Sequence, residues 1–299
     1  MKVLVTGVNG QLGHDIMNEL AQRGHEGIGS DLSQTYQGID DQSAVKNMPY
    51  VSLDITNQTE VNRVIKAVNP DAVIHCAAWT AVDKAEDEIE KCRLVNKNGT
   101  EYITEVCRLL NVPIMYFSTD YVFNGEGTKP WNEYDERQPL NVYGLTKYEG
   151  ELAVESYEKH FIVRIAWVFG INGNNFIKTM LRLGKERGAV SVVYDQIGSP
   201  TYTYDLAKLA VDMIITDKYG TYHATNQGFC SWYDFACEIF KQAEMDVKVT
   251  PVNSEQFPVK AKRPHNSRMD EDELDKSGFV RLPSWQDALT RYLKLLQVK

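Results

Sequence analysis

The length, composition and charge of the chain exclude several classes of protein. Its 299 residues are enough for one large α/β domain, or for one domain with a smaller lobe. The formal net charge of −9 argues against a protein that wraps nucleic acid, because phosphates repel an acidic surface. No apolar run approaches the roughly 18 residues of a membrane-spanning helix, and the short apolar start stops at a glycine, unlike a signal peptide. We expect a cytoplasmic protein with no nucleic acid and no membrane among its partners.

The cysteines predict neither a disulfide framework nor a zinc site. There are five of them, an odd number, and no two form a Cys-x-x-Cys pair. We expect most of them to be thiols that pack in the core.

The first half of the chain alternates short apolar runs with longer amphipathic ones. The short runs are almost wholly apolar, as in strands that are covered on both faces. The β-α-β-α order predicts a parallel sheet with helices on both sides, the Rossmann-type doubly wound α/β fold. We expect strands at 3–5, 28–30, 51–53, 71–75 and 113–118, and helices at 11–23, 61–68 and 95–110.

The pattern changes after about residue 170. Helical segments at 176–187, 203–215, 232–243 and 285–296 are separated by loops rich in Gly, Pro and Asn. The segment 220–224 has the composition of a strand and is expected to return to the main sheet. We therefore expect a smaller mixed α/β C-terminal lobe, formed by about 167–198 plus 227–299, beside a main domain formed by 1–166 plus about 199–226.

A glycine-rich loop follows the first predicted strand and opens the first helix. Gly7 permits a tight turn, Gly10 lets the backbone approach a pyrophosphate, and Gly13 lets helix and strand pack closely. The free N–H groups of the helix N-terminus then favour an anion. This arrangement predicts that the main domain binds a dinucleotide, with loop contacts from Gly7, Asn9, Gly10, Gln11, Leu12 and Gly13.

Two acids follow the next strands of the series. Asp31 lies 18 residues after Gly13, where an acid accepts hydrogen bonds from a ribose 2′-hydroxyl and favours NAD, although a loop or capping role is the alternative. Ser30 beside it tolerates a 2′-phosphate, so the cofactor preference stays open. Asp54 is placed to meet the adenine or to cap the next helix. Further cofactor contacts are expected at Ile55, Ala77, Ala78 and Thr80.

Tyr143 and Lys147 are four residues apart and share one face if this segment is helical. A free tyrosine has a pKa of about 10, which is too high for proton exchange at neutral pH. A nearby ammonium favours the phenolate, so we expect Lys147, with the positive charge of the nicotinamide nearby, to lower the pKa of Tyr143. The pair then predicts a tyrosine that protonates a carbonyl oxygen while hydride arrives at carbon, and that also contacts the cofactor together with Lys147.

Thr119 ends the fifth predicted strand. In an open α/β sheet, ligands bind beyond the carboxyl ends of the strands. Thr119 is therefore predicted to hydrogen-bond the reacting oxygen, with helix capping as the alternative.

The glycine loop, Thr119 and the Tyr143-x-x-x-Lys147 pair together resemble the extended short-chain dehydrogenases that act on nucleotide sugars. Four further segments resemble the dTDP-4-dehydrorhamnose reductase family, over nearly the whole chain: 77–86, 118–125, 139–144 and 263–267. This resemblance implies reduction of the 4-keto group of dTDP-4-dehydro-6-deoxy-L-mannose to dTDP-L-rhamnose, which feeds cell-surface polysaccharide. It implies NADPH as the hydride donor, with NADH as an alternative.

The resemblance also implies the residues that bind the substrate. In related 4,6-dehydratases a Thr-Asp-Glu triplet supplies the base for elimination, whereas here Tyr121 replaces the glutamate, which favours a reductase. The cluster 260–268 is basic and suits a sugar-nucleotide pyrophosphate, with a solvated basic face as the alternative. Trp167 faces the sugar or packs in the core. The expected substrate contacts are Thr119, Asp120, Tyr121, Val122, Trp167, Arg263 and Asn266.

Some members of the family bind Mg²⁺ through acidic residues at a dimer interface. This chain has Asp15 in place of a glutamate on the first helix, and its acid near Asp205 is displaced by an insertion. A hard cation needs several oxygen ligands. The sequence assembles no such set, so it predicts no metal site, and either a monomer or a homodimer.

Two other functions fit parts of the pattern. One is a related epimerase or dehydratase of nucleotide sugars. The other is a non-catalytic regulatory subunit that binds NADP, since the regulatory beta subunit of methionine adenosyltransferase resembles these reductases. Retention of Thr119, Tyr143, Lys147 and the basic cluster favours the enzyme.

Overall fold

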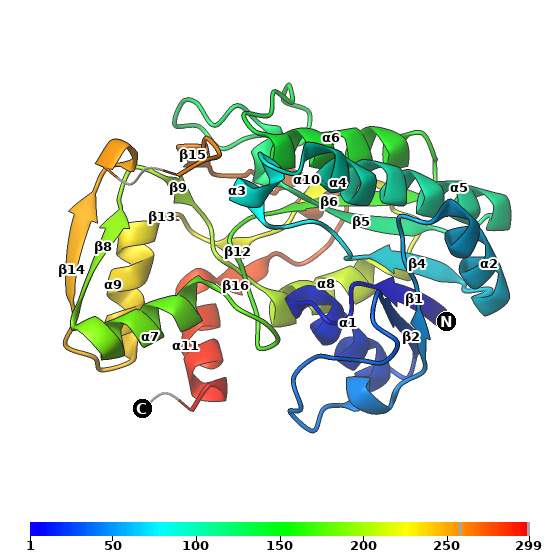
Figure 1. Ribbon diagram of the computed structural model, residues 1–299, viewed down its shortest axis with the longest axis horizontal. Coiled ribbons are helices and arrows are strands. Elements are labelled where there is room, and N and C mark those ends of the chain that lie inside the picture. The colour runs from blue at the N-terminus through cyan, green and yellow to red at the C-terminus, as the bar shows by residue number, and fades with distance from the viewer. Residues whose placement is uncertain (257–258, 298–299) are drawn as a thin grey trace.

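A parallel seven-stranded sheet forms the centre of the computed structural model, which describes residues 1–256 and 259–297. The strand order is β11-β6-β5-β4-β1-β2-β3, so the chain reverses its direction of travel across the sheet between β1 and β4 (Figure 1). This is the switch point at which doubly wound sheets bind ligands. The strands are β1 Lys2–Thr6, β2 Glu26–Asp31, β3 Tyr50–Ser52, β4 Ala72–His75, β5 Ile114–Thr119, β6 His160–Ile165 and β11 Gly220–His223.

Helices cover both faces of this sheet, and alternate strand residues point into two separate cores. Val3 and Val5 pack with α1 and α8, whereas Leu4 between them packs with α2 and α5 on the opposite face. This period of two is the geometry of a pleated strand. The helices are α1 Gln11–Gln22, α2 Gln58–Val68, α3 Val82–Ala85, α4 Ile89–Arg93, α5 Thr100–Leu110, α6 Val142–Glu155 and α8 Thr203–Ile214.

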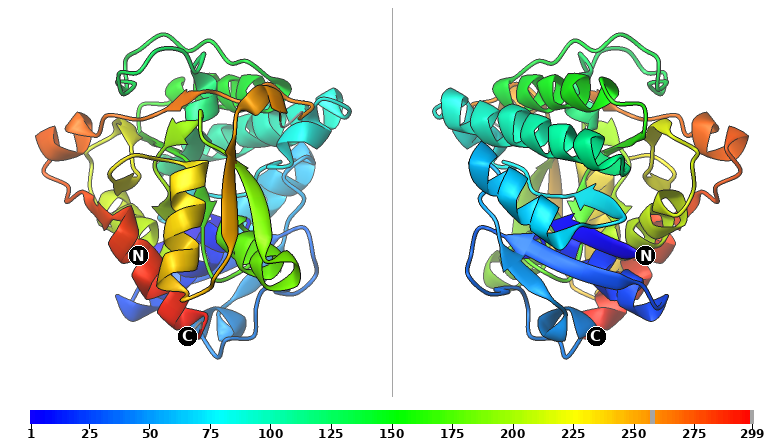
Figure 2. Two further views of the ribbon diagram at one scale, coloured as in Figure 1. Left: turned by 90° about the vertical axis from the view of Figure 1, so that its left-hand side faces the viewer. Right: turned by 90° about the vertical axis from the view of Figure 1, so that its right-hand side faces the viewer.

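Most of the remaining elements surround a third hydrophobic core beside the carboxyl ends of the sheet, whereas Leu274 of α10 and Leu282 of β16 pack in the first core. Figure 2 shows α7, α9 and α11 beside the paired strands β8 and β14. Its core is rich in aromatic side chains, with Phe169 and Phe235 at its centre. The elements are β7 Val168–Phe169, α7 Phe176–Arg187, β8 Ala189–Val193, β9 Ile197–Gly198, β10 Thr201–Tyr202, β12 Asn226–Gln227, β13 Cys230–Ser231, α9 Trp232–Gln242, β14 Lys248–Val252, β15 Asn266–Ser267, α10 Asp272–Lys276, β16 Leu282–Ser284 and α11 Trp285–Leu295.

The expected α/β fold is confirmed, and the elements begin and end within a few residues of their predicted bounds. The segment 220–224 does return to the main sheet, where β11 pairs with β6 in parallel. The helix expected at 95–110 is longer, because α4 and a π-helical turn at Leu94–Gly99 precede α5. The division into two lobes stays a prediction, and its residues 257–258 and 298–299 lie outside the described part of the chain.

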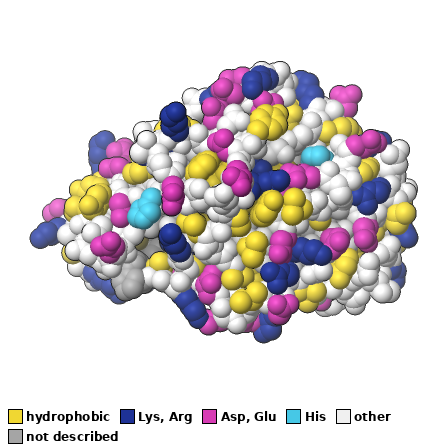
Figure 3. All heavy atoms as spheres, turned by 90° about the horizontal axis from the view of Figure 1, so that it is seen from above, with side chains coloured by type: hydrophobic (Ala, Val, Ile, Leu, Met, Phe, Trp, Pro, Cys, Tyr) yellow, Lys and Arg dark blue, Asp and Glu magenta, His cyan; other side chains and the backbone are white. Residues whose placement is uncertain are grey.

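The surface charges, the cysteines and the helix lengths can be compared with the expectations from composition. Figure 3 shows basic and acidic side chains interspersed over one face. All five cysteines are free thiols, and Cys92, Cys107 and Cys230 are buried. Across the described residues, no helix is both long enough and apolar enough to cross a bilayer.

Candidate active site

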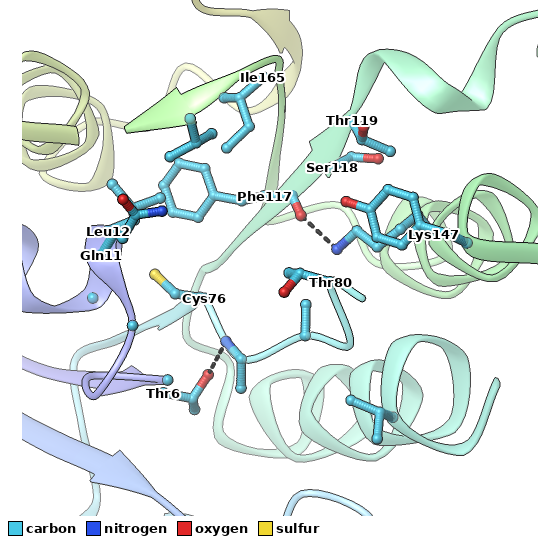
Figure 4. A pocket seen from close by; sticks show the side chains of 18 of the residues that line it. Thr6, Gln11, Leu12, Cys76, Thr80, Phe117, Ser118, Thr119, Lys147 and Ile165 are labelled. Atoms are coloured by element: carbon cyan, nitrogen blue, oxygen red, sulfur yellow. Dashed lines mark hydrogen bonds between the residues drawn. The ribbon is translucent and has the colours of Figure 1, made fainter. Parts of the chain in front are cut away.

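A cavity of about 690 Å³ opens at the carboxyl ends of the sheet strands, at the switch point between β1 and β4. Figure 4 shows Gln11 and Leu12 on one side of it and Thr119 and Lys147 on the other. The cavity therefore joins the glycine loop to the predicted catalytic residues. The predicted site residues that line it are Gly7, Gly10, Gln11, Leu12, Gly13, Asp31, Asp54, Ile55, Ala77, Ala78, Thr80, Thr119, Asp120, Tyr121, Tyr143, Lys147 and Trp167.

The glycine loop has the close contacts that its sequence predicts. Gly7 has φ of +73°, and a Cβ on it would lie 2.6 Å from the backbone nitrogen of Ala77. A Cβ on Gly13 would overlap the carbonyl oxygen of Gly7. No side chain caps the first turn of α1 at Gly10. The residues of this turn line the cavity, where a dinucleotide pyrophosphate would fit against the N–H groups of the helix N-terminus.

Asp31 ends β2 at the rim of the same cavity. One carboxylate oxygen accepts a hydrogen bond from the backbone N–H of Asn9 at 3.0 Å, and the other accepts one from Leu32 at 2.8 Å. Asp54 lines the wall near Ile55, but it also accepts hydrogen bonds from the backbone and side chain of Thr56, at 2.9 and 2.6 Å. The alternative that Asp54 caps the next helix is wrong, because the cap of α2 is Asn57, which accepts from the backbone N–H of Glu60 at 3.2 Å.

Tyr143 and Lys147 lie on α6, which begins at an Asn141 cap that accepts from the backbone N–H of Gly144 at 2.8 Å. Lys147 is almost fully buried, and its Nζ donates to the carbonyl oxygen of Phe117 at 2.7 Å (Figure 4). The ammonium also lies 4.0 Å from the centre of the Tyr116 ring. One turn of helix thus places the tyrosine and the lysine together on the cavity wall.

Burial gives Tyr143 and Lys147 pKa values that differ from those expected from the sequence. Burial raises the pKa of Tyr143, although a hydrogen bond with Thr119 opposes the rise. Burial also lowers the pKa of Lys147 to about 7, against the opposing charge of Glu151. The expected lowering of the Tyr143 pKa by Lys147 is wrong, because desolvation of the phenolate sets the direction and Thr119, not Lys147, is the neighbour that opposes it. The contribution expected from the nicotinamide charge stays a prediction. Tyr143 is a protonated phenol at neutral pH.

Thr119 and Asp120 lie together where β5 ends. The Thr119 hydroxyl donates to the Asp120 carboxylate at 3.0 Å and accepts from the backbone N–H of Tyr121 at 3.2 Å. Burial raises the pKa of Asp120 to about 6. The capping alternative for Thr119 is thus realised, while the same residue still lines the cavity beside Tyr143.

Tyr121 lines the cavity and contacts the basic cluster 260–268 through Arg263. Its ring meets Tyr143 edge-on at 5.5 Å between centres, and its hydroxyl accepts from Arg263 at 3.2 Å. Arg263 also pairs with Asp83 at 2.7 Å, and Lys260 pairs with Asp87. Burial raises the pKa of Tyr121 to about 12. Tyr121 is therefore protonated at neutral pH and unavailable as a base, as expected for a reductase rather than a dehydratase.

Four predicted site residues do not line the cavity: Asn9, Val122, Arg263 and Asn266. Val122 is fully buried in the turn after β5. Asn266 is also buried, and its amide donates to the carbonyl oxygens of Glu126 and Lys129 at 3.2 and 2.8 Å. Arg263 touches the cavity only through Tyr121. Direct contacts of these four residues with cofactor or substrate stay predictions, and their positions outside the cavity wall do not support them.

Sequence reasoning missed several residues of the cavity wall, including Cys76, Phe117, Ile165, Gly173 and Trp232. Cys76 and Phe117 belong to β-strand ends whose edge the switch-point rule does identify. Trp232 had no comparable signal, because it comes from α9 and stacks on Trp167 at 3.7 Å between ring centres. Trp167 has φ of +48°, a strained conformation for a tryptophan, and lines the cavity as well as packing.

The two acids discussed for a metal both have protein partners. Asp15 accepts a hydrogen bond from Thr203, and burial raises its pKa to about 7. Asp205 pairs with Arg291 through both oxygens, at 2.8 and 2.6 Å. Among the residues that the structure describes, no group of three or more His, Cys, Asp or Glu side chains could hold a metal ion.

Known proteins resemble this chain over its whole length. A family model described as the RmlD substrate binding domain matches residues 1–298. The dTDP-4-dehydrorhamnose reductase of Escherichia coli K12 is 37% identical over 99% of this chain and 98% of its own. The spore coat polysaccharide biosynthesis protein SpsK of Bacillus subtilis is 37% identical over 98% of this chain and 97% of its own.

A solved structure matches the fold as well. The dTDP-4-dehydrorhamnose reductase of Bacillus anthracis, in complex with NADP, has a TM-score of 0.90 and 40% identity over 98% of this chain and 99% of that one. A family model and relatives of this identity, all spanning nearly the full chain, agree with the glycine loop and with Tyr143 and Lys147 on one cavity. The chain belongs to the dTDP-4-dehydrorhamnose reductase family of extended short-chain dehydrogenases.

Proposed function

We propose that this enzyme reduces the 4-keto group of dTDP-4-dehydro-6-deoxy-L-mannose to give dTDP-L-rhamnose. The observation that carries the proposal is the protonated Tyr143 beside Lys147 and Thr119, on the same cavity as the glycine loop. The names of the relatives, dTDP-4-dehydrorhamnose reductases, support a dTDP-sugar as the substrate. Use of the product in cell-surface polysaccharide stays a prediction, to which the name of the Bacillus subtilis relative lends support.

The residues of the chain supply the proton side of the reaction. A reduced nicotinamide, when bound, supplies a hydride to the keto carbon. Tyr143 gives its phenolic proton to the keto oxygen. The positive charge of the Lys147 ammonium stabilises the tyrosinate that remains. Thr119 lies beside Tyr143 on the cavity wall, where we propose that it contacts the same keto oxygen. The Lys147–Phe117 hydrogen bond keeps the lysine at this wall.

The cofactor preference depends on the end of β2. The sequence predicted NADPH with NADH as an alternative. Asp31 offers a carboxylate at the place of the ribose 2′-position, and Lys147 is the sole Lys or Arg among the described residues that line the cavity. A 2′-phosphate would meet this negative charge without a balancing cation. We therefore propose that the enzyme accepts NADH at least as well as NADPH, although a relative binds NADP.

A direct assay tests the proposed function. Purified protein is mixed with dTDP-4-dehydro-6-deoxy-L-mannose and NADH or NADPH, and the absorbance of the reduced cofactor is followed with product analysis. We expect stoichiometric oxidation of the cofactor and formation of dTDP-L-rhamnose. Sugar conversion without net cofactor oxidation would indicate an epimerase or dehydratase. Cofactor binding without any turnover would indicate a regulatory subunit.

The C-terminal lobe is proposed to hold the nucleotide part of the substrate. The segment 260–268 approaches the cavity through Arg263 and Tyr121, and Trp167 and Trp232 contribute aromatic faces to the wall. Binding of Mg²⁺ is not part of this proposal, because Asp15 and Asp205 already have protein partners. The chain is proposed to act as a monomer or a homodimer.

A further inference from the structure

The glycine loop is held from behind by one buried side chain, that of Asn172. It lies in the segment 170–175, which joins β7 to α7 and which we call the crossing segment. Its Nδ2 donates to the carbonyl oxygens of Asn9 and Gly10, at 2.9 and 3.1 Å. Its Oδ1 accepts from the backbone N–H of Ile39 at 2.9 Å. Only 4% of the residue is exposed, so this amide is committed to three backbone partners.

These contacts fix the direction of one free N–H group in the glycine loop, since the N–H of Gly10 already donates to the carbonyl oxygen of Gly7 at 3.0 Å. A trans peptide is planar, so the carbonyl of one residue and the N–H of the next point in opposite directions. Holding the carbonyl oxygen of Gly10 toward Asn172 therefore turns the N–H of Gln11 the other way. Gln11 is the first residue of α1 and lines the cavity, and first-turn N–H groups have no acceptor within their helix.

Two further contacts make the arrangement rigid. The Gln11 side chain accepts from the backbone N–H of Gly170 at 2.8 Å and from the Asn175 amide at 3.0 Å. A Cβ on Gly38 would lie 2.8 Å from the Asn172 Nδ2, so the loop after Asp31 packs directly against this amide. Asn172 thus joins the loop beside the cofactor ribose to the loop beside the pyrophosphate.

We propose that Asn172 is a positioning residue for the dinucleotide. It does not line the cavity, and it acts by orienting the backbone N–H of Gln11 toward the pyrophosphate and by holding the loop after Asp31 against the glycine loop. The inference rests on the proposed function, because it concerns the same cofactor site. It assigns cofactor affinity, rather than proton transfer, to this residue.

Replacement of Asn172 separates cofactor binding from chemistry. For Asn172→Ala we expect the Kd of NADH to rise about tenfold, whereas kcat at saturating NADH and the KM of the sugar nucleotide change less than about twofold. Asn172→Asp keeps the shape but turns a carboxylate oxygen toward two carbonyl oxygens and adds charge near the pyrophosphate. It should bind NADH more weakly than the alanine variant, and the difference should shrink at high salt.

Asn226 provides a matched control. It is also buried, its Nδ2 donates to Asp205 and to the carbonyl oxygen of Pro283 at 2.9 and 3.0 Å, and its Oδ1 accepts from the backbone N–H of Tyr202 at 2.7 Å. Asn226→Ala removes as many hydrogen bonds outside the cofactor site. It should lower the midpoint of thermal unfolding and leave the Kd of NADH within about twofold of the wild-type value.

The Kd of NADH is measured by titration without any sugar nucleotide, which keeps the two proposals distinguishable. Equal NADH affinity in the wild type and both Asn172 variants overturns the positioning role, as does an equal loss in Asn226→Ala. Wild-type protein that binds NADH but does not reduce the keto sugar refutes the proposed function alone. Wild-type protein that binds neither NADH nor NADPH refutes both.

Discussion

Tyr143 and Lys147 show how burial decides the chemistry of single residues. Desolvation keeps the tyrosine protonated before the reaction and brings the pKa of the lysine to about 7. Because the raised pKa also opposes loss of the phenolic proton, the charge of Lys147 is needed to stabilise the tyrosinate that forms. Asp120 and Tyr121 extend the same environment, with pKa values raised by burial to about 6 and about 12. Tyr143 and Tyr121 are both protonated at neutral pH, so either can deliver a proton to a carbonyl and neither is available as a base.

Removing the phenolic hydroxyl tests the acid directly. We expect Tyr143→Phe to lower kcat by about 10²–10⁴-fold, because it removes the proton donor while the ring still packs. The Kd of NADH should change little in a titration. Tyr148→Phe on the same helix, where Arg137 lies 4.6 Å from the ring centre, is the matched control and should retain wild-type turnover. Unchanged turnover in Tyr143→Phe would remove this residue from the mechanism.

The ionisation of Lys147 should appear in the pH dependence of the rate. Its pKa is lowered by burial to about 7, so the ammonium is lost as the pH rises through this value. We expect kcat/KM of the wild type to fall on the alkaline side of about pH 7. Lys147→Met, which keeps the length but carries no charge, should be slow and lack this transition. A variant profile that retains the transition would assign it to another group.

At the scale of elements, the site is built where a strand, a loop and a helix meet. The glycine loop turns the chain from β1 into α1, and the crossing segment then fixes that turn through Asn172. On the opposite wall, α6 carries both catalytic candidates on one face because they are one turn apart. Each of these elements therefore positions its site residues through its own backbone conformation and its packing on the sheet.

Gly13 tests the contact between strand and helix in the glycine loop. We expect Gly13→Ala to weaken NADH binding at least about tenfold, because its Cβ would overlap the Gly7 carbonyl oxygen and displace the first turn of α1. Titration with NADH measures the loss. Gly127→Ala is the control: Gly127 lies outside the cavity wall, and although its φ is +76°, a Cβ there would meet nothing within 4 Å. Equal affinities in the two variants would contradict the close-packing argument.

At the scale of the whole molecule, several carboxyl groups are buried away from the active site. Burial raises the pKa of Asp15, Glu133 and Glu271 to about 7 each. A carboxyl whose pKa is higher in the folded chain than in the unfolded chain binds its proton preferentially when folded. Its contribution to stability is therefore lost as the pH rises from the unfolded pKa through the folded one.

Glu271 allows this linkage to be measured. Its pKa is raised from 4.5 to about 7, and its oxygen accepts from Thr225 N and Oγ1 at 2.7 and 2.9 Å, which a glutamine can also do. We expect Glu271→Gln to raise the free energy of unfolding at pH 8 by about 1 to 3 kcal/mol, with little change at pH 5. Urea unfolding at both pH values measures it. The exposed Glu158→Gln should show no such pH dependence, and an equal response of both variants would contradict the role of burial.

The sequence by itself determined the features that depend on local pattern. Short, almost wholly apolar runs and the β-α alternation determined the doubly wound sheet, since strands covered on both faces must be apolar. The spacing of Gly7, Gly10 and Gly13 and of Tyr143 and Lys147 determined which residues share the cavity, because strand ends and helix turns place them without long-range information.

The tertiary structure alone decided the features that depend on distant segments and on burial. Asn172 reaches the glycine loop from 162 and 163 residues away, and Arg263 reaches Tyr121 from 142 residues away. The pKa of Tyr143 rises because surrounding segments exclude water, which no spacing of residues reveals. Val122 and Asn266 resembled ligand contacts in sequence, but packing turned their side chains into the protein. Local periodicity therefore sets the fold and most of the cavity wall, whereas long-range packing sets the charge states and the supporting contacts.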